Sequence, residues 1–351
     1  MCIRKIIVIR FRRVGDAILS SVLCSTLKAS FADSQVDYVL NEEIAPLFEG
    51  HPAIDRLIIF SREDQSNSKR YLAKVRRIMR EGHYDMIVDT RSTFKTLPFA
   101  LFSLRSPLRL GLRKSYNRWI HNYRTDCNQL GADEVCRTLQ LLRPLEHRFS
   151  ICYERIFKIY VTEEEKYDFR RTMEASGIDF SKPIIVCAVA TRIAHKEWDR
   201  AQMVATLRLI LERYVDVQLV FNFSGEAEKR IAGDICCLMN TPPRVFVNIY
   251  ARTLRELAAM IAVSSFFFGN EGGPRHLSQA LDIPSFAIYP PSISKSVWLP
   301  NACKRFQGIE PDDISEFIGT TYSERFSLIS TAEVWMRLQP MLDSFLYRRL
   351  S

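Results

Sequence analysis

A glycine and an aspartate follow the first apolar run of the chain. Ile6 to Ile9 lead through a short basic stretch to Gly15 and Asp16, and helical periodicity begins there. This order predicts a strand, a tight turn and a helix, and ligands bind at such turns in an open parallel sheet. The Asp16 carboxylate could face a ligand cleft, or it could serve only as the helix N-cap. The turn lacks the G-x-G-x-x-G pattern of dinucleotide sites.

A pair of glycines marks a second candidate site. Gly272 and Gly273 follow an apolar run and precede Pro274, which is favoured at the start of a helix. The free N–H groups of such a turn point along the positive end of the helix dipole, which makes a phosphate site. Arg275 and His276 would add donors, and a bound anion would explain cations at a helix start. The alternative is a purely structural turn.

Two further loops follow predicted strands. Lys196 lies between the first strand and the first helix of the second half, where it could reach a diphosphate as a point charge. A solvated loop lysine is the alternative. Glu226 and Glu228 open the next helix and could accept hydrogen bonds from ribose hydroxyls, or simply complement the helix dipole.

Short runs of Val, Ile and Phe alternate with amphipathic segments along the whole chain, which predicts βα units and parallel sheets. Strands are expected at 5–10, 36–40, 54–60 and 85–89, and again at 183–188, 217–223, 244–248, 266–269 and 285–289. Helices are expected at 17–29, 69–81, 199–214, 226–238, 253–263 and 274–281. These two series predict two similar α/β domains, joined by a helix and linker within 162–182.

Composition narrows the class of protein. The 351 residues are 47% hydrophobic and 25% charged, as in an ordinary globular protein of two domains. No apolar run approaches the roughly 20 residues of a membrane span, and we expect neither a signal peptide nor a transmembrane helix. The nine cysteines include no Cys-x-x-Cys pair and indicate buried free thiols in a reducing cytosol. We expect no metal site.

Positive charge is concentrated in the first half. Residues 1–160 hold 27 Lys and Arg against 17 Asp and Glu, and the formal net charge of the whole chain is +9. The densest stretch interleaves basic residues with aromatic ones: Arg105, Arg109, Arg113, Lys114, Arg118 and Arg124 with Tyr116, Trp119 and Tyr123. A solvated basic face and a docking surface for a polyanion, either anionic lipid or nucleic acid, are both open.

Taken together and in order, these segments resemble glycosyltransferase family 9, the bacterial heptosyltransferases that build the inner core of lipopolysaccharide from ADP-heptose. The resemblance rests on the opening strand with Gly15 and Asp16, on Tyr84 to Asp89, and on Lys196-x-Trp198. It continues through residues 253–258 and the segment from Gly269 to Leu277. It implies a GT-B architecture, α/β with two Rossmann-like domains facing an interdomain cleft.

The resemblance also implies domains and roles. Residues 1–170 would bind the acceptor, and 180–330 would bind the nucleotide sugar. Apart from the resemblance, the apolar side chains of a helix predicted within 331–351 lie largely on one face, and we expect this helix to pack back on the first domain. Asp16 would be the general base of an inverting, metal-independent transfer, and Lys196 would face the donor phosphates. Glu228 would hold the ribose, while Glu271, Gly272, Gly273 and His276 would line the diphosphate and sugar.

The sequence departs from the family pattern at the donor turn. Glu271-Gly272-Gly273 stands where an aspartate, a Thr or Ser, and a glycine are common, so the donor is open between ADP-heptose and another nucleotide sugar. Arg12 and Arg13 replace small polar residues beside Asp16. Together with Arg113 and Lys114, they are candidates for contacts with acceptor phosphates.

The partners expected from this resemblance are a nucleotide diphosphate sugar and a lipid-linked core oligosaccharide. The location would be cytoplasmic, with peripheral contact to the inner membrane, and we expect no cofactor and no nucleic acid. Two other classes stay open: a nucleotide-dependent oxidoreductase or epimerase, since doubly wound sheets host many chemistries, and a non-catalytic basic module that binds lipid or nucleic acid.

Overall fold

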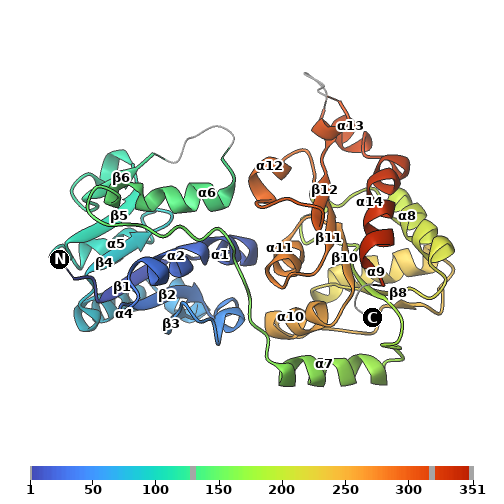
Figure 1. Ribbon diagram of the computed structural model, residues 1–351, viewed down its shortest axis with the longest axis horizontal. Coiled ribbons are helices and arrows are strands. Elements are labelled where there is room, and N and C mark those ends of the chain that lie inside the picture. The colour runs from blue at the N-terminus through green and yellow to red at the C-terminus, as the bar shows by residue number, and fades with distance from the viewer. Residues whose placement is uncertain (1, 127–131, 316–320, 348–351) are drawn as a thin grey trace. The chain divides into compact units, whose positions relative to one another are not determined.

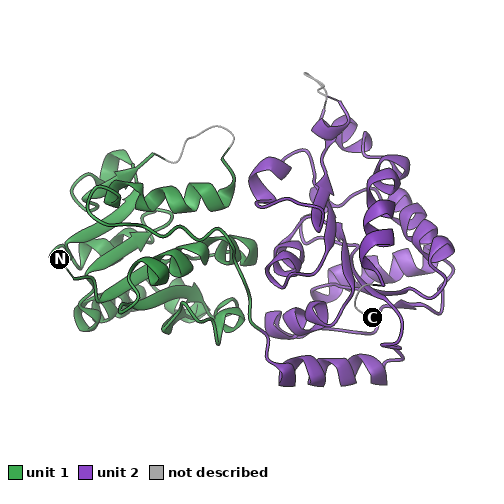
Figure 2. Ribbon diagram, in the orientation of Figure 1, with its two compact units in different colours: residues 1–160 green, residues 161–351 purple. Residues whose placement is uncertain are grey.

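The chain forms two compact units, residues 1–160 and 161–351 (Figure 2). The computed structural model describes residues 2–126, 132–315 and 321–347. Each unit holds one parallel sheet with its own helices, and the labels below are those of Figure 1.

The first unit is built on a six-stranded parallel sheet in the order β3-β2-β1-β4-β5-β6. Its strands are β1 (Lys5–Ile9), β2 (Gln35–Asn41), β3 (Arg56–Phe60), β4 (Met86–Asp89), β5 (Leu108–Leu112) and β6 (Tyr123–Thr125). Its helices are α1 (Val14–Ser20), α2 (Val22–Ser30), η1 (Ala45–Phe48), α3 (Arg62–Ser66), α4 (Ser68–Gly82), α5 (Leu97–Leu101), η2 (Ser115–Asn117), α6 (Glu134–Leu139) and η3 (Gln140–Leu145).

The second unit repeats this order as β12-β11-β10-β7-β8-β9, again all parallel. Its strands are β7 (Ile184–Ala188), β8 (Gln218–Phe221), β9 (Val245–Phe246), β10 (Phe266–Asn270), β11 (Ser285–Ile288) and β12 (Phe306–Ile309). Its helices are α7 (Glu163–Ala175), η4 (Ala194–Lys196), α8 (Arg200–Arg213), α9 (Gly225–Leu238), α10 (Leu254–Ala262), α11 (Gly273–Ala280), α12 (Lys295–Trp298), η5 (Pro311–Asp313), α13 (Tyr322–Ser327) and α14 (Thr331–Phe345).

Helix α4 illustrates how local sequence and packing agree. The Asn67 side chain accepts a hydrogen bond from the Arg70 N–H and caps the helix, which ends at left-handed His83. Tyr71, Val75 and Met79 recur at helical spacing, and all three are buried against the sheet of the first unit. Burial of this stripe fixes α4 on the sheet, while its basic face stays in water.

The strand order reverses once in each sheet. The chain runs outward from β1 to β2 and β3 and then returns to place β4 on the other side of β1, and β7 and β10 are related in the same way. At such a switch point, the loops after the two central strands diverge and leave a crevice at the carboxyl edge. We therefore expect ligand-binding groups on the loops after β1, β4, β7 and β10.

Most predicted strands and helices are present within a few residues of their expected bounds. The helix expected at 17–29 is two helices, α1 and α2, which meet at Ser21. The arginine-rich stretch was treated as surface and yet contains β5 and β6. Arg109 is part of that sheet: its guanidinium donates to the main-chain oxygens of Leu104, Ser106 and Ile120. Arg109 therefore belongs to the fold rather than to a docking surface.

The boundary between the units falls earlier than residue 170. Helix α7 belongs to the second unit, where the Arg255 guanidinium on α10 donates to the Glu165 carboxylate at 2.7 Å. A capping box between Thr162 and Glu165 starts this helix. The helix expected at the start of 162–182 is therefore present, and it packs within the second unit.

The C-terminal helix does not pack as expected. Val334, Leu338, Met341 and Leu342 of α14 are buried in the core of the second unit. In Figure 1, α14 lies beside α8. Tyr214 follows α8 directly, and its hydroxyl donates to the Asp343 carboxylate of α14 at 2.7 Å. The expectation that this helix covers the first domain is therefore wrong, because the second unit already buries its apolar face.

Gly269, near the end of β10, provides a test of the second sheet. Its φ is +140°, and a Cβ atom there would lie 2.4 Å from the carbonyl oxygen of Ala188 in β7. We expect Gly269→Ala to lower the free energy of unfolding by about 3 kcal/mol. Gly233→Ala is the control, since no atom lies within 4 Å of that Cβ position on α9. Urea unfolding measures the stability of both variants. Equal stabilities would contradict the close approach of Gly269 to the Ala188 carbonyl oxygen.

Candidate functional sites at the two switch points

Asp16 lies in the first turn of α1 and forms an ion pair inside the first unit. Its side chain is 13% exposed, and its Oδ1 lies 2.5 Å from Nη2 of Arg10. The N-cap position is Arg13, without a side-chain cap bond, so the interpretation of Asp16 as an N-cap is wrong. The ion pair instead fixes the direction of the carboxylate at the carboxyl edge of β1.

Arg10 and Glu134 complete this cluster, and sequence reasoning missed both. Arg10 is buried at the end of β1, and its Nη2 also lies 3.5 Å from Oε1 of Glu134 on α6. Burial raises the pKa of Glu134; Arg10 opposes that effect and Asp16 adds to it. One cation thus serves two carboxylates. The signal in the sequence was Arg10 directly after the apolar run Ile6 to Ile9, because an arginine that is buried there needs a charged partner.

The other basic candidates of the first unit are exposed. Arg12 has a left-handed φ of 74°, an uncommon backbone conformation for a residue with a side chain, directly before α1. Arg13 is exposed beside it. Arg113 pairs with Asp126 at 2.8 Å, and Lys114 is exposed. These four side chains are accessible to anions.

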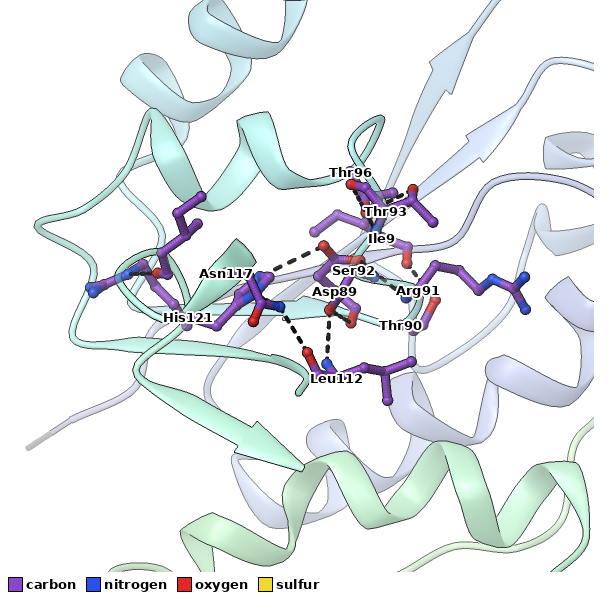
Figure 3. A network of polar contacts seen from close by, with 12 residues as sticks. Ile9, Asp89, Thr90, Arg91, Ser92, Thr93, Thr96, Leu112, Asn117 and His121 are labelled. Carbon is purple, nitrogen blue, oxygen red and sulfur yellow. Dashed lines mark hydrogen bonds and ion pairs between the residues drawn. The ribbon is translucent and has the colours of Figure 1, made fainter. Parts of the chain in front are cut away.

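A buried polar network lies beside the switch point, at the ends of β4 and β5 (Figure 3). Asp89 accepts hydrogen bonds from the Arg91 and Ser92 N–H groups at 3.1 and 2.8 Å. The Asn117 amide donates to Nδ1 of His121 at 3.1 Å and to the Leu112 carbonyl at 2.8 Å. Nε2 of His121 therefore carries the ring proton and faces Oδ2 of Asp89 at 3.6 Å.

Burial shifts both titratable groups of this network toward their neutral forms. It raises the pKa of Asp89 to about 6, and it lowers the pKa of His121 to about 4, with Arg109 and Arg124 acting in the same direction. His121 is therefore neutral at pH 7. The network ties the loop after β4 to the loop after β5 without exposing a charge.

In the second unit, Asn270 joins the loops after β7 and β10. Its amide nitrogen donates to the carbonyls of Ala188 and Val189 at 3.0 and 3.2 Å, and its Oδ1 accepts from the Trp198 N–H at 2.9 Å. The Trp198 indole in turn donates to the carbonyl of Ile329. Every polar atom of this buried amide is used to hold the two loops at the switch point together.

The two glycines lie where a phosphate site was predicted. Gly272 is the N-cap of α11 and Gly273 is its first residue, with Pro274 next. Both glycines are half-buried, and no described acceptor takes the proton of either N–H group. The start of α11 therefore offers unused donors at the positive end of its dipole.

Glu271 and His276 form a buried pair beside these glycines. Nε2 of His276 lies 3.5 Å from Oε1 of Glu271, and both side chains are less than 10% exposed. Burial alone would raise the pKa of Glu271, but His276, Arg275 and Lys196 outweigh it and hold that pKa below its usual range. The carboxylate is thus ionised at neutral pH.

Arg275 does not act as predicted. It is fully buried, and its guanidinium donates to the Gln279 side chain at 2.5 Å and to the carbonyl of Trp298. The cation that was expected to bind an anion at the start of α11 instead stabilises the packing between α11 and α12.

Lys196 and Glu228 line the same edge of the second sheet. Lys196 ends η4 and is half-buried, and its ammonium group forms no ion pair within the described part of the chain. Oε2 of Glu228 accepts from the Ser224 N–H at 2.7 Å, so this residue does cap its own helix. Burial raises the pKa of Glu228. The ammonium group is available to a ligand, whereas one carboxylate oxygen of Glu228 is already engaged.

Two searches cover the described residues only. Residues 2–126, 132–315 and 321–347 contain no group of three or more His, Cys, Asp or Glu side chains placed to hold a metal ion. Within the same ranges, no helix is both long and apolar enough to cross a bilayer.

Two doubly wound units with polar groups at their switch points define an α/β protein of the GT-B fold class. Comparison with known proteins agrees. The glycosyl transferase family 9 protein of Veillonella parvula has a TM-score of 0.82 at 18% identity, over 98% of this chain and 99% of that one. The E. coli ADP-heptose lipopolysaccharide heptosyltransferase II has a TM-score of 0.75 at 18% identity, over 97% and 99%.

Sequence comparison gives the family. The model of glycosyltransferase family 9 (heptosyltransferase) matches residues 72–301, and the chain belongs to this family. Lipopolysaccharide heptosyltransferase 1 of Campylobacter coli is 20% identical over 81% of this chain and 83% of its own length. Lipopolysaccharide heptosyltransferase 3 of Escherichia coli is 23% identical over 78% and 80%. The protein is therefore a glycosyltransferase, and the family and fold predicted from the sequence are confirmed.

Proposed function

We propose that this protein transfers heptose from ADP-heptose to a hydroxyl of a lipopolysaccharide core oligosaccharide, with inversion at the anomeric carbon and without a metal ion. Family membership and the names of the relatives support the sugar and the acceptor. The observation that carries the reaction class is the complementary chemistry of the two edges: a fixed carboxylate in one unit, and unused N–H donors with an unpaired ammonium in the other.

Asp16 is proposed as the general base. As the acceptor oxygen attacks, its proton must leave, and a carboxylate held in one direction by Arg10 can accept it. Glu134 approaches the same Nη2 atom of Arg10 and adds a second negative charge beside Asp16. Arg10 and Glu134 are thus positioning residues for the base.

The second unit is proposed to hold the donor. Negative charge develops on the leaving diphosphate, and the Gly272 and Gly273 N–H groups together with Lys196 and His276 would stabilise it. These groups would take the part that a metal ion plays elsewhere. Glu228 is the candidate for the ribose hydroxyls, through the oxygen that does not cap α9. Glu271 would accept hydrogen bonds from the sugar.

The acceptor side and the location are proposed as well. Arg12, Arg13, Arg113 and Lys114 are exposed cations that fit the phosphate groups of a lipid-linked core oligosaccharide. Such an acceptor implies work at the cytoplasmic face of the inner membrane, with peripheral contact. No cofactor and no nucleic acid is needed for this reaction.

A panel of donors tests the function. We expect transfer from ADP-heptose and slower or no transfer from other ADP-, GDP- and UDP-sugars, measured with a core acceptor. Because Glu271-Gly272-Gly273 changes the turn expected to read the sugar, another nucleotide sugar is the second candidate donor. Turnover of no member of the panel would contradict the proposed reaction.

Asp16→Asn should leave folding and ADP binding intact and reduce kcat by roughly 100-fold or more, as loss of a general base usually does. Calorimetry with ADP and steady-state kinetics separate the two effects. Asp33→Asn, an exposed aspartate of the same unit, is the control. Near-normal turnover by the Asp16 variant would remove it from the base role.

Variants of Arg10 and Glu134 should shift the pH dependence of kcat/KM in opposite directions, which tests their effect on Asp16. Arg10→Gln removes the opposite charge beside Asp16, so the pH of half-maximal activity on the acid side should rise by about one unit. Glu134→Gln removes a like charge, so the same midpoint should fall. Tyr38 and Cys24 also face this cluster, but burial raises the pKa of both, so they stay neutral in this range.

Arg137 and Arg91 also lower the pKa of Glu134, and both are kept in every variant. Arg10→Lys keeps the cation and should restore the acid midpoint toward that of the unmodified protein. Shifts of the same sign in Arg10→Gln and Glu134→Gln would show that the cluster is only structural.

Lys196→Ala should weaken ADP binding by about tenfold or more, because it removes the unpaired ammonium at the proposed diphosphate site. Lys182→Ala removes a half-exposed lysine of the same unit that is paired with Asp179, and serves as the control. Calorimetric titration with ADP measures both. Equal affinities would place Lys196 outside the donor site.

A further inference from the structure

Three large aromatic side chains of the first unit are exposed at the loops after β4 and β5. Phe94 is 76% exposed, Tyr116 43% and Trp119 83%. The Phe94 and Tyr116 rings stack with their centroids 4.6 Å apart and their planes 22° apart. Contiguous exposed apolar surface marks an interaction site more often than single exposed side chains do, and the stacked Phe94 and Tyr116 rings are contiguous.

This aromatic surface is built on a rigid base. The Tyr116 hydroxyl donates to the carbonyl of Ser92 at 2.9 Å, which joins it to the buried network of Figure 3. Gly111 allows that network to close, because a Cβ atom there would lie 2.5 Å from Oγ of Ser92 and 2.8 Å from Cε1 of His121. The buried network holds the loops after β4 and β5 together, and the Tyr116 ring is anchored to it through Ser92.

The same segment carries only positive charge. Residues 90–125 contain eight Lys and Arg and no Asp or Glu. The Arg118 guanidinium lies 5.5 Å from the centroid of the Trp119 ring, and Arg118 and Lys114 are exposed without an ion pair to any described carboxylate. Cations and amphipathic rings thus share one surface.

We propose that this surface, formed by Phe94, Tyr116, Arg118 and Trp119, docks the protein on an anionic phospholipid bilayer. Trp and Tyr rings favour the headgroup level of a membrane, and Lys and Arg are attracted to anionic headgroups. The surface combines both properties, whereas sequence-tolerant binding of duplex nucleic acid needs chiefly the cations. The inference deepens the proposed function, since it gives an enzyme acting on a lipid-linked acceptor its membrane contact.

Vesicle sedimentation without any nucleotide sugar tests the docking. The full chain should sediment with vesicles of phosphatidylcholine mixed with phosphatidylglycerol, much less with phosphatidylcholine alone, and binding should weaken with added salt. Trp119→Ser and Arg118→Glu should each weaken binding by about tenfold, and both positions are exposed enough to leave the unfolding midpoint unchanged.

Matched controls exist in the second unit. Tyr167 is 61% exposed with the Arg171 guanidinium 5.9 Å from its ring centroid, the same pairing as Trp119 with Arg118. Tyr167→Ser and Arg171→Glu should leave vesicle binding as it is. Equal losses in all four variants would show that binding is not specific to this surface and would overturn the assignment, as would equal binding to neutral and anionic vesicles.

Two other results would also overturn the proposal. Tight binding of duplex DNA that Trp119→Ser and Arg118→Glu abolish, without vesicle binding, would assign the surface to nucleic acid. Loss of binding to a delipidated core oligosaccharide in Trp119→Ser would make it an acceptor subsite. A chain that binds vesicles but transfers no sugar refutes only the proposed function, and one that transfers sugar but ignores vesicles refutes only the docking.

Discussion

Each half of this protein depends on one topological constraint, the reversal of strand order beside the first strand of its sheet. The reversal makes the loops after β1 and β4 diverge in one unit, and those after β7 and β10 in the other. Buried polar side chains then fix the edges: Arg10 holds Asp16, and Asn270 holds the loops of the second sheet. These partners hold the Asp16 carboxylate and the loops of the second sheet in place.

The two edges differ in chemistry although their topology is the same. The edge of the first unit carries a carboxylate cluster around one arginine, surrounded by exposed cations. The edge of the second unit carries unused amides at the start of α11, a half-buried lysine and an ionised glutamate. A repeated fold therefore supplies two different kinds of site, because ligand-binding residues lie on loops that do not determine the strand order.

Much of the fold followed from the sequence. Apolar strands with amphipathic helices between them gave both sheets, since such alternation has few other solutions. The strands β5, β6 and β12 were missed. In β5 and β6 the arginines outweigh a short apolar pattern, and Arg109 donates to main-chain carbonyls there instead of facing water. The C-terminal helix α14 was predicted. Its apolar stripe indicated that it packs against another surface but did not identify the second unit as that surface.

For the candidate sites, the sequence by itself determined which residues follow the central strands: Asp16, Lys196 and the segment from Glu271 to His276. Only the tertiary structure decided their partners. Arg275 is buried and donates to Gln279. Asp16 pairs with the buried Arg10, and Glu134, more than a hundred residues further along the chain, lies near the same Arg10 guanidinium. Order along the chain fixes a residue's place on its strand or loop, whereas a buried charge is neutralised by whichever side chain packing brings within a few ångströms.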